Sequence, residues 1–171
     1  GQAEHDNLAQ CILISKDKKL LEKVNIELSK QLKKIPRVSV ARKSLSNNGI
    51  LMYVNSDTKI IEIVNKIAPE HLELNVKNFK LLVNKICNAG SICLGKYAVM
   101  AMTDYNVGSN HVLPTNGSAK YSSGISVNEF YKRISYINLS KKGIESLGPS
   151  VITLANYEGL VGHAQSVIKR I

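Results

Sequence analysis

Residues 11–32 read CILISKDKKLLEKVNIELSKQL, and this stretch combines the two patterns that decide the fold. The run CILI at its start is continuously apolar, which is typical of a short buried strand. Leucine and valine then recur at helical spacing, and this pattern stops before Pro36. Residues 49–68, GILMYVNSDTKIIEIVNKIA, repeat the order of strand and helix, with Ser56 as the expected N-cap and Pro69 as the stop. The sequence therefore predicts a strand followed by a helix, twice in succession.

The alternation of strands and helices continues beyond these stretches. Short extended runs are expected at residues 72–74 and 91–94, with a helix at 77–86 between them. Short strands separated by helices of about ten or more residues favour parallel pairing with right-handed crossovers. We therefore predict an α/β fold, in which residues 1–125 form a three-layer domain with a mainly parallel sheet, of an incomplete Rossmann-like type. A helical C-terminal extension is expected to follow it.

The composition changes at residues 103–124, which are rich in Gly, Ser, Asn and Thr and fit neither the helical nor the strand period. A stretch of this length without regular structure is a functional loop or a plain surface loop. We expect residues 126–156 to form a small connecting extension and residues 157–171 a helical arm. Because this region has too few apolar residues for a core of its own, we expect it to pack on something else, such as another subunit. Within it, helices are expected at residues 127–132 and 141–147, an extended stretch at 134–139, and a new helix that Pro149 opens.

Composition limits the class of protein. Hydrophobic residues make up 44% of the 171 residues and charged residues 21%, which excludes a collagen-like, mucin-like or disordered chain. No apolar run approaches the roughly 18 residues that span a bilayer, so we expect no membrane contact. The three cysteines are odd in number and form no CxxC pair, which argues against a disulfide scaffold and favours the reducing cytoplasm.

The net charge of +10 leaves a second hypothesis open, a basic nucleic-acid-binding α/β module. Only four of the 23 basic residues are arginines, tryptophan is absent, and no stacking array of Tyr and Phe accompanies the basic residues. We therefore favour a solvated, lysine-rich surface and expect no nucleic-acid partner. The densest basic cluster contains Lys33, Lys34, Arg37, Arg42 and Lys43.

Two pairs of polar residues are candidates for chemistry. Gln2 and His5 are three residues apart, so one helical turn would present both on the same side, as metal ligands or as part of a frayed terminus. Glu70 and His71 follow a helix stop and can point into one cleft, where the carboxylate would tune the imidazole. A histidine that the helix dipole stabilises is the alternative for the second pair.

Further oxygen and nitrogen donors lie later in the chain. Asp104, Asn110 and His111 belong to the irregular segment, where Asp and Asn also form turns with their own backbone. Glu158 and His163 lie five residues apart at the start of the expected terminal helix, and a rotation of about 140° would separate them, so one helix face cannot carry both. Together these donors suit a zinc site with open positions. The chain contains no GxGxxG after a strand, P-loop, HExxH or GxSxG motif.

Five segments together form a recognisable pattern over essentially the whole chain. They are QAEHD at residues 2–6, APEHLE at 68–73, DYNVGSNHVLPT at 104–115, SSGISV at 122–127 and EGLVGHA at 158–164. In their order and approximate spacing they closely resemble the C-terminal part of the L-histidinol dehydrogenases. That family oxidises L-histidinol through histidinal to L-histidine, the last steps of histidine biosynthesis, with two NAD+ and a zinc ion.

The resemblance implies a role for residues of each segment. Glu70 and His71 would form a catalytic acid–base pair, and His111 would line the pocket. The C-terminal arm would cross to a partner subunit in an intertwined homodimer. The zinc ligands would be Gln2, His5, Asp104 and His163, and contacts to L-histidinol would come from Gln2, His5, His71, Asp104, Glu158 and His163.

The resemblance also implies that the chain is the C-terminal portion of a longer enzyme. Members of the family are considerably longer, and their NAD+-contacting residues would lie upstream of residue 1.

We therefore expect the 171-residue chain alone to be inactive, because a hydride that leaves the substrate would meet no bound acceptor. Mixed with L-histidinol and NAD+, the purified chain should produce no NADH absorbance above a protein-free control. Reduction of NAD+ by the chain would contradict this expectation.

Overall fold

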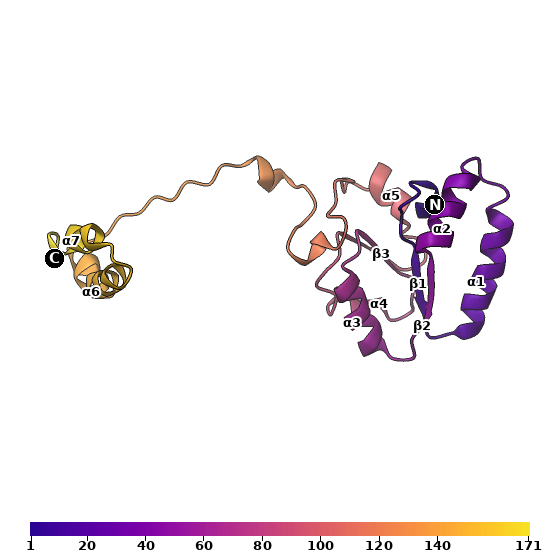
Figure 1. The fold of residues 1–171 in the computed structure, drawn as a ribbon, viewed down its shortest axis with the longest axis horizontal. Helices are drawn as coiled ribbons and strands as arrows, with labels where there is room; N and C mark the ends of the chain where they lie inside the picture. Colours follow the sequence, from indigo (N-terminus) through magenta and orange to yellow (C-terminus); the bar gives the residue numbers. More distant parts are fainter. The chain divides into compact units, whose positions relative to one another are not determined.

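The structure is a computed structural model that describes residues 1–171. The chain divides into two compact units, an N-terminal unit, Gly1–Ser126, and a C-terminal unit, Val127–Ile171 (Figure 1). The division falls just after the segment 103–124, where the sequence loses its regular periodicity. None of the helices has both the length and the apolar character needed to cross a lipid bilayer.

The N-terminal unit begins with a parallel pair of strands. β1 and β2 pair with Ile12 opposite Ile50 and Ser15 opposite Tyr53, and α1 packs against both strands (Figure 1). The Asp17 carboxylate accepts hydrogen bonds from two backbone N–H groups of the first turn, so α1 begins where its free donors are satisfied. The elements are η1 (Gln2–Glu4), β1 (Ile12–Ser15), α1 (Lys18–Gln31), α2 (Val38–Asn48) and β2 (Ile50–Tyr53).

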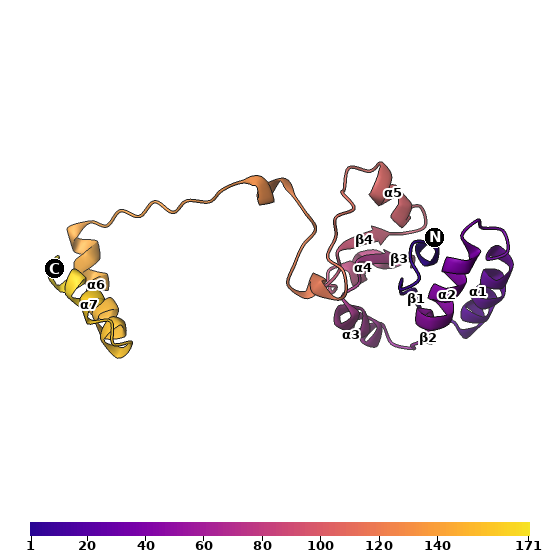
Figure 2. The ribbon, with the colours of Figure 1, turned by 45° about the horizontal axis from the view of Figure 1, so that its top comes forward.

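A second parallel pair follows in the same unit. β3 and β4 pair with His71 opposite Ser91 and Leu74 opposite Leu94, and α5 lies close to this pair (Figure 2). The Ser56 hydroxyl caps α3, as its sequence predicts. The elements are α3 (Asp57–Ile67), β3 (His71–Leu74), α4 (Phe79–Val83), β4 (Ser91–Leu94), α5 (Met100–Tyr105) and η2 (Ser118–Lys120).

The α/β class and the parallel pairing are confirmed. Backbone hydrogen bonds join β1 to β2 and β3 to β4, so the strands form two two-stranded sheets rather than one continuous sheet. The helix α2 was not predicted, because the residues that it buries are the small Ala41 and the polar Ser44 rather than large apolar side chains. The helix expected at residues 77–86 is shorter than predicted, and α5 extends into the stretch that was expected to be irregular.

The helix α2 holds the N-terminal segment in place. The Ser44 side chain is 0% exposed, and its hydroxyl donates a hydrogen bond to the carbonyl of Ala9 at 2.7 Å. Ala3 of η1 and Ala41 of α2 are both buried, and η1 packs on α2. Small side chains allow the two elements to approach closely. This contact positions residues 2–5, which contain two of the predicted zinc ligands.

The C-terminal unit is a pair of packed helices preceded by a 3₁₀ turn. The prediction that Pro149 opens a new helix is wrong, because Pro149 lies inside one continuous helix. The preceding Gly148 has no Cβ to clash with the proline ring, so the helix can pass through this position. Residues 131–140 form neither helix nor strand. The elements are η3 (Val127–Phe130), α6 (Lys141–Tyr157) and α7 (Val161–Ile168).

Gly148 also sets how closely the two helices pack. A Cβ at this position would collide with the side chains of Ile171 and Val167. We therefore expect Gly148→Val to lower the free energy of unfolding of the C-terminal unit by about 1–3 kcal/mol, because the new side chain overpacks against Val167 and Ile171 and its Cβ also meets the ring of Pro149. Denaturant unfolding followed by circular dichroism would measure this change.

The matched control is Gly162→Val in α7. A Cβ at Gly162 would have no neighbour within 4 Å, so this variant should unfold like the wild type. Equal stability of the two valine variants would contradict the proposed contact.

Candidate functional site

The candidate site lies on one face of the β3–β4 sheet. Because side chains alternate along a strand, His71 and Glu73 share one face of β3, and Glu73 stands opposite Cys93 of β4. Leu72 and Leu74 belong to the other face, where Leu74 is 8% exposed. Apolar packing on one face therefore holds the strand while the polar residues of the other face meet α5.

Two carboxylates lie near Nε2 of His71. Glu70 Oε1 lies 3.9 Å and Asp104 Oδ1 lies 4.0 Å from His71 Nε2, and the His71 side chain is 13% exposed. His71 Nδ1 and Asp104 Oδ1 are buried and have no hydrogen-bond partner within the chain. A buried polar atom left unpaired costs about 1–3 kcal/mol. The arrangement is therefore suited to a ligand that supplies a hydrogen bond to the ring and a donor or cation to the carboxylate.

Close backbone packing fixes Glu70 at the start of β3. The N–H of Ser91 donates to the Glu70 carbonyl at 2.9 Å. A Cβ at Gly90 would lie 2.6 Å from that carbonyl oxygen and 3.0 Å from the ring of Pro114. Only glycine fits this position without a backbone shift. Pro114 belongs to the segment 103–124, so this segment packs beside the backbone of Glu70.

Asn110 has a structural role in the same segment. Its amide Nδ2 donates to the carbonyl of Ile125, and its Oδ1 accepts from the N–H of Val112 at 2.9 Å. The alternative that this asparagine forms a turn with its own backbone is therefore confirmed. His111, which was expected to line the pocket, is exposed.

Sequence reasoning assigned no role to Glu73 and Cys93. Glu73 Oε1 accepts a hydrogen bond from the N–H of Met100, the first residue of α5, at 3.0 Å. Burial raises the pKa of the Cys93 thiol, and the carboxylates of Glu73 and Asp104 raise it further. The alternation of side chains along a strand could have identified Glu73, because Glu73 lies two positions after His71 and must share its face.

The predicted ligands Gln2 and His5 lie at the N-terminal turn. Gln2 begins η1 and His5 caps its end, so both belong to the segment that packs on α2. No group of three or more His, Cys, Asp or Glu side chains lies close enough to hold a metal ion. Of the predicted zinc ligands in the N-terminal unit, only His5 and Asp104 are of these types, and Gln2 is an amide. The zinc set therefore stays a prediction.

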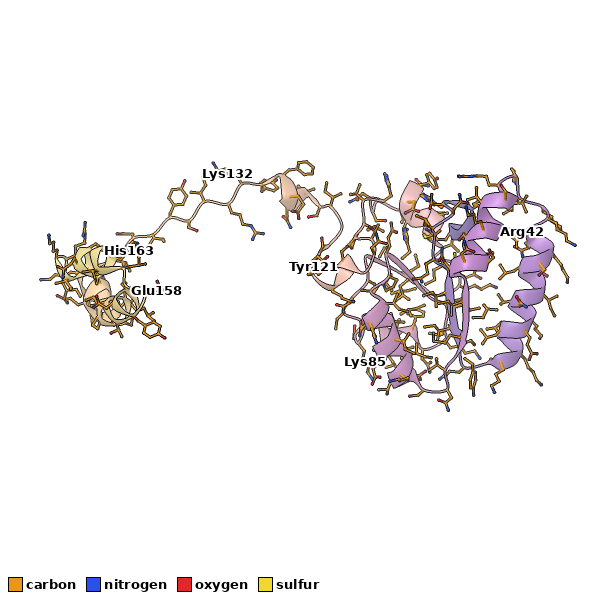
Figure 3. The ribbon with its side chains drawn as sticks, viewed as in Figure 1. Arg42, Lys85, Tyr121, Lys132, Glu158 and His163 are labelled. Carbon is orange, nitrogen blue, oxygen red and sulfur yellow. The ribbon has the colours of Figure 1, made fainter.

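Glu158 and His163 both belong to the C-terminal unit, and both are exposed (Figure 3). The expectation that both residues lie at the start of one terminal helix is wrong. Glu158 caps the end of α6, whereas His163 lies in the first turn of α7. Gly159, with a φ of 75°, breaks the helix between them. The expected rotation of about 140° therefore does not separate Glu158 from His163, because no single helix carries both residues.

The family model described as "Histidinol dehydrogenase" matches residues 1–171. The chain belongs to the histidinol dehydrogenase family. The family expected from the five sequence segments is thus confirmed. The histidinol dehydrogenase of Pelagibacter ubique (strain HTCC1062) is 80% identical over 171 residues, which are 100% of this chain and 40% of that protein. The histidinol dehydrogenase of Zymomonas mobilis is 43% identical over 171 residues, again 100% of this chain and 40% of the other.

A solved structure extends the similarity to three dimensions. The crystal structure of histidinol dehydrogenase from Elizabethkingia anophelis matches with a TM-score of 0.87 and 37% sequence identity. The match covers 98% of this chain and 39% of that chain. The chain therefore spans about 40% of the length of the curated relatives that it matches.

The surroundings of Cys93 predict a difference in cysteine reactivity. Cys93 is 4% exposed and its pKa is raised, so little thiolate forms near neutral pH, whereas Cys87 is exposed. We expect iodoacetamide to modify Cys87 in the folded protein and Cys93 only after denaturation or at higher pH, since a raised pKa moves thiolate formation upward. Peptide mass mapping would measure both sites. Rapid labelling of Cys93 in the folded protein near neutral pH would contradict this assignment.

Proposed function

We propose that this chain supplies the acid–base and most of the zinc-binding residues of an NAD-dependent histidinol dehydrogenase. The enzyme would oxidise L-histidinol through histidinal to L-histidine, in the last steps of histidine biosynthesis and in the cytoplasm. One observation carries the proposal: Nε2 of His71 lies within 4.0 Å of the carboxylates of both Glu70 and Asp104, and two buried atoms of this cluster lack partners. Membership of the family supplies the reaction class.

Zinc fits the chemistry of the residues present. Asp104 Oδ1 is a buried carboxylate oxygen without a hydrogen-bond partner, as expected of an oxygen that meets a cation. The ligands would be Asp104, Gln2, His5 and His163, of which only the aspartate is anionic. This donor set would leave net positive charge on the metal. When bound, zinc would anchor the nitrogen atoms of L-histidinol and NAD+ would accept the hydrides.

The acid–base pair would move the protons of both oxidations. Nε2 of His71 faces the two carboxylates, so the neutral ring would carry its hydrogen there and leave the unpartnered Nδ1 as the proton acceptor. His71 would take the hydroxyl proton of the alcohol as the hydride leaves the carbinol carbon. Glu70 would then take a proton from the water that adds to the aldehyde, which prepares the hydrate for the second hydride loss. The carboxylates at 3.9 and 4.0 Å would stabilise the positive charge that His71 gains.

A homodimer with exchanged C-terminal units would complete the site. The segment that follows Ser126 exposes large apolar side chains, including Phe130 at 79%, Tyr136 at 90% and Ile137 at 84%. Several large apolar side chains exposed in one short segment are typical of a segment that packs against another protein surface. The C-terminal unit of one subunit would then bring Glu158 and His163 to the substrate site of its partner.

A chimera tests the catalytic roles. In it, this chain replaces the matching region of the Pelagibacter ubique protein, which supplies the remainder of the enzyme. We expect His71→Gln to lower kcat for L-histidinol by about 100-fold or more, the usual contribution of a general base. Glu70→Gln should slow the oxidation of histidinal more than that of L-histidinol. Stopped-flow measurement of NADH formation from each substrate would separate the two steps.

The matched control is Glu62→Gln. Glu62 is an exposed carboxylate of α3 that pairs with Lys59 at 2.7 Å, so its neutral amide should leave both steps unchanged. An active chimera in which His71→Gln and Glu70→Gln retain wild-type rates would refute the assigned roles.

A further inference from the structure

The side chain of Glu73 joins the strand of the acid–base pair to the helix of Asp104. Its Oε1 accepts a hydrogen bond from the N–H of Met100 at 3.0 Å. Met100 is the first residue of α5, and the residue before it, Val99, makes no side-chain cap. A free N–H at the start of a helix needs an acceptor. Glu73 supplies it from β3, a strand that lies far back in the sequence.

Few contacts hold the helix α5. It contains six residues, none of which is buried, and a helix this short does not persist by itself. Two side-chain bonds near it stay inside its own segment: Thr103 to the Met100 carbonyl at 2.7 Å and Ser109 to the Thr103 carbonyl at 2.9 Å. Two contacts tie the first turn to the sheet: the bond from Met100 to Glu73 of β3, and the contact of the Thr103 side chain with the Cys93 thiol of β4. Of these two, the bond to Glu73 reaches the free N–H at the start of the helix, so loss of the Glu73 carboxylate should loosen this end of α5.

The spacing of strand and helix matches across this contact. Glu73 lies two positions after His71 on β3, a step of about 6.6 Å at the usual rise of a strand. Asp104 lies four positions after Met100 on α5, a step of about 6 Å at the usual rise of a helix. Met100 and Asp104 therefore lie on the same side of the helix, one turn apart. When Glu73 binds Met100, Asp104 comes to rest against His71, where Oδ1 lies 4.0 Å from Nε2.

We propose that Glu73 is a positioning residue of this site. Its bond to Met100 sets the place of α5 and thereby the separation between Asp104 and His71. The part of this inference that concerns zinc rests on the proposed function, in which Asp104 is a ligand. The hydrogen-bond acceptor, rather than the negative charge, is the property that matters, because the partner is a neutral backbone N–H.

The first test follows the helix without any ligand. Glu73→Ala removes the acceptor, whereas Glu73→Gln keeps an acceptor oxygen at the same place. In the 171-residue chain, we expect Glu73→Ala to speed hydrogen exchange of the Met100 amide and the rest of α5 by about tenfold, the usual effect of losing a helix cap. Glu73→Gln should keep most of the protection. Unchanged exchange in Glu73→Ala, or equal loss in both variants, would overturn the positioning role.

The second test measures zinc affinity of the same chain by competition with a coloured chelator. Groups that orient a metal ligand contribute about 10- to 100-fold to affinity, so Glu73→Ala should weaken zinc binding by about tenfold. Glu73→Gln should restore most of it, and Asp104→Ala should weaken binding at least as much as Glu73→Ala. The matched control is Glu62→Ala, which likewise removes a carboxylate with one hydrogen-bond partner, here the side chain of Lys59, and it should bind zinc like the wild type.

The outcomes separate this inference from the proposed function. If Asp104→Ala weakens zinc binding and Glu73→Ala does not, the positioning role is overturned while the zinc site stands. If the wild type binds no zinc, or Asp104→Ala leaves the affinity unchanged, the proposed zinc set is contradicted for this chain, and amide exchange of α5 then decides for or against Glu73. Circular dichroism of each variant would show that a loss of binding does not come from unfolding.

Discussion

The candidate site depends on the register in which β3 pairs with β4. Because side chains alternate along a strand, a slip of one residue would send His71 and Glu73 to the opposite face of the sheet. Burial holds the register: Leu74 is 8% exposed on the opposite face, and Cys93 is 4% exposed opposite Glu73. Burying one leucine side chain is worth about 1.5–3 kcal/mol. Apolar packing on one face therefore secures the chemistry of the other.

The chain enters β3 through a strained turn. Ala68 ends α3 with a φ of 51°, a left-handed conformation that costs about 1–2 kcal/mol for a residue with a Cβ. Contacts on both sides of the turn offset this cost, since Ala68 is 0% exposed and the N–H of Gly90 donates to the Pro69 carbonyl at 2.9 Å. The next backbone bond, from Ser91 to Glu70, opens the β3–β4 ladder. The strained turn at Ala68 and the first bond of the β3–β4 ladder together place the Glu70 carboxyl group directly before the His71 imidazole.

Apolar patterns predict the elements that bury one face, and they miss the elements that polar contacts hold. β1, α1 and α3 follow from strand and helix periodicity. The pattern misses α2, because its fully buried Ser44 is polar, and it misses α5, because no residue there is buried and Glu73 caps it from a distant strand. The residues of the site also fall into those that the sequence pattern predicts and those that it misses. Glu70 and His71 are neighbours in the sequence, whereas no spacing predicts that Asp104 lies against His71; only the family resemblance placed them in one site.

The electrostatics of β4 bear on how an aldehyde would be oxidised at this site. Such an oxidation needs a nucleophile that adds to the carbonyl, either a thiolate or an activated water. Cys93 is the cysteine on the site face, but burial and the carboxylates of Glu73 and Asp104 raise its pKa, so it remains a neutral thiol. The Glu70 side chain is 34% exposed and can meet water. The carboxylates that suit the site to a cation therefore disfavour a second anion on sulfur. Under the proposed function, these surroundings favour water activated by Glu70 as the nucleophile.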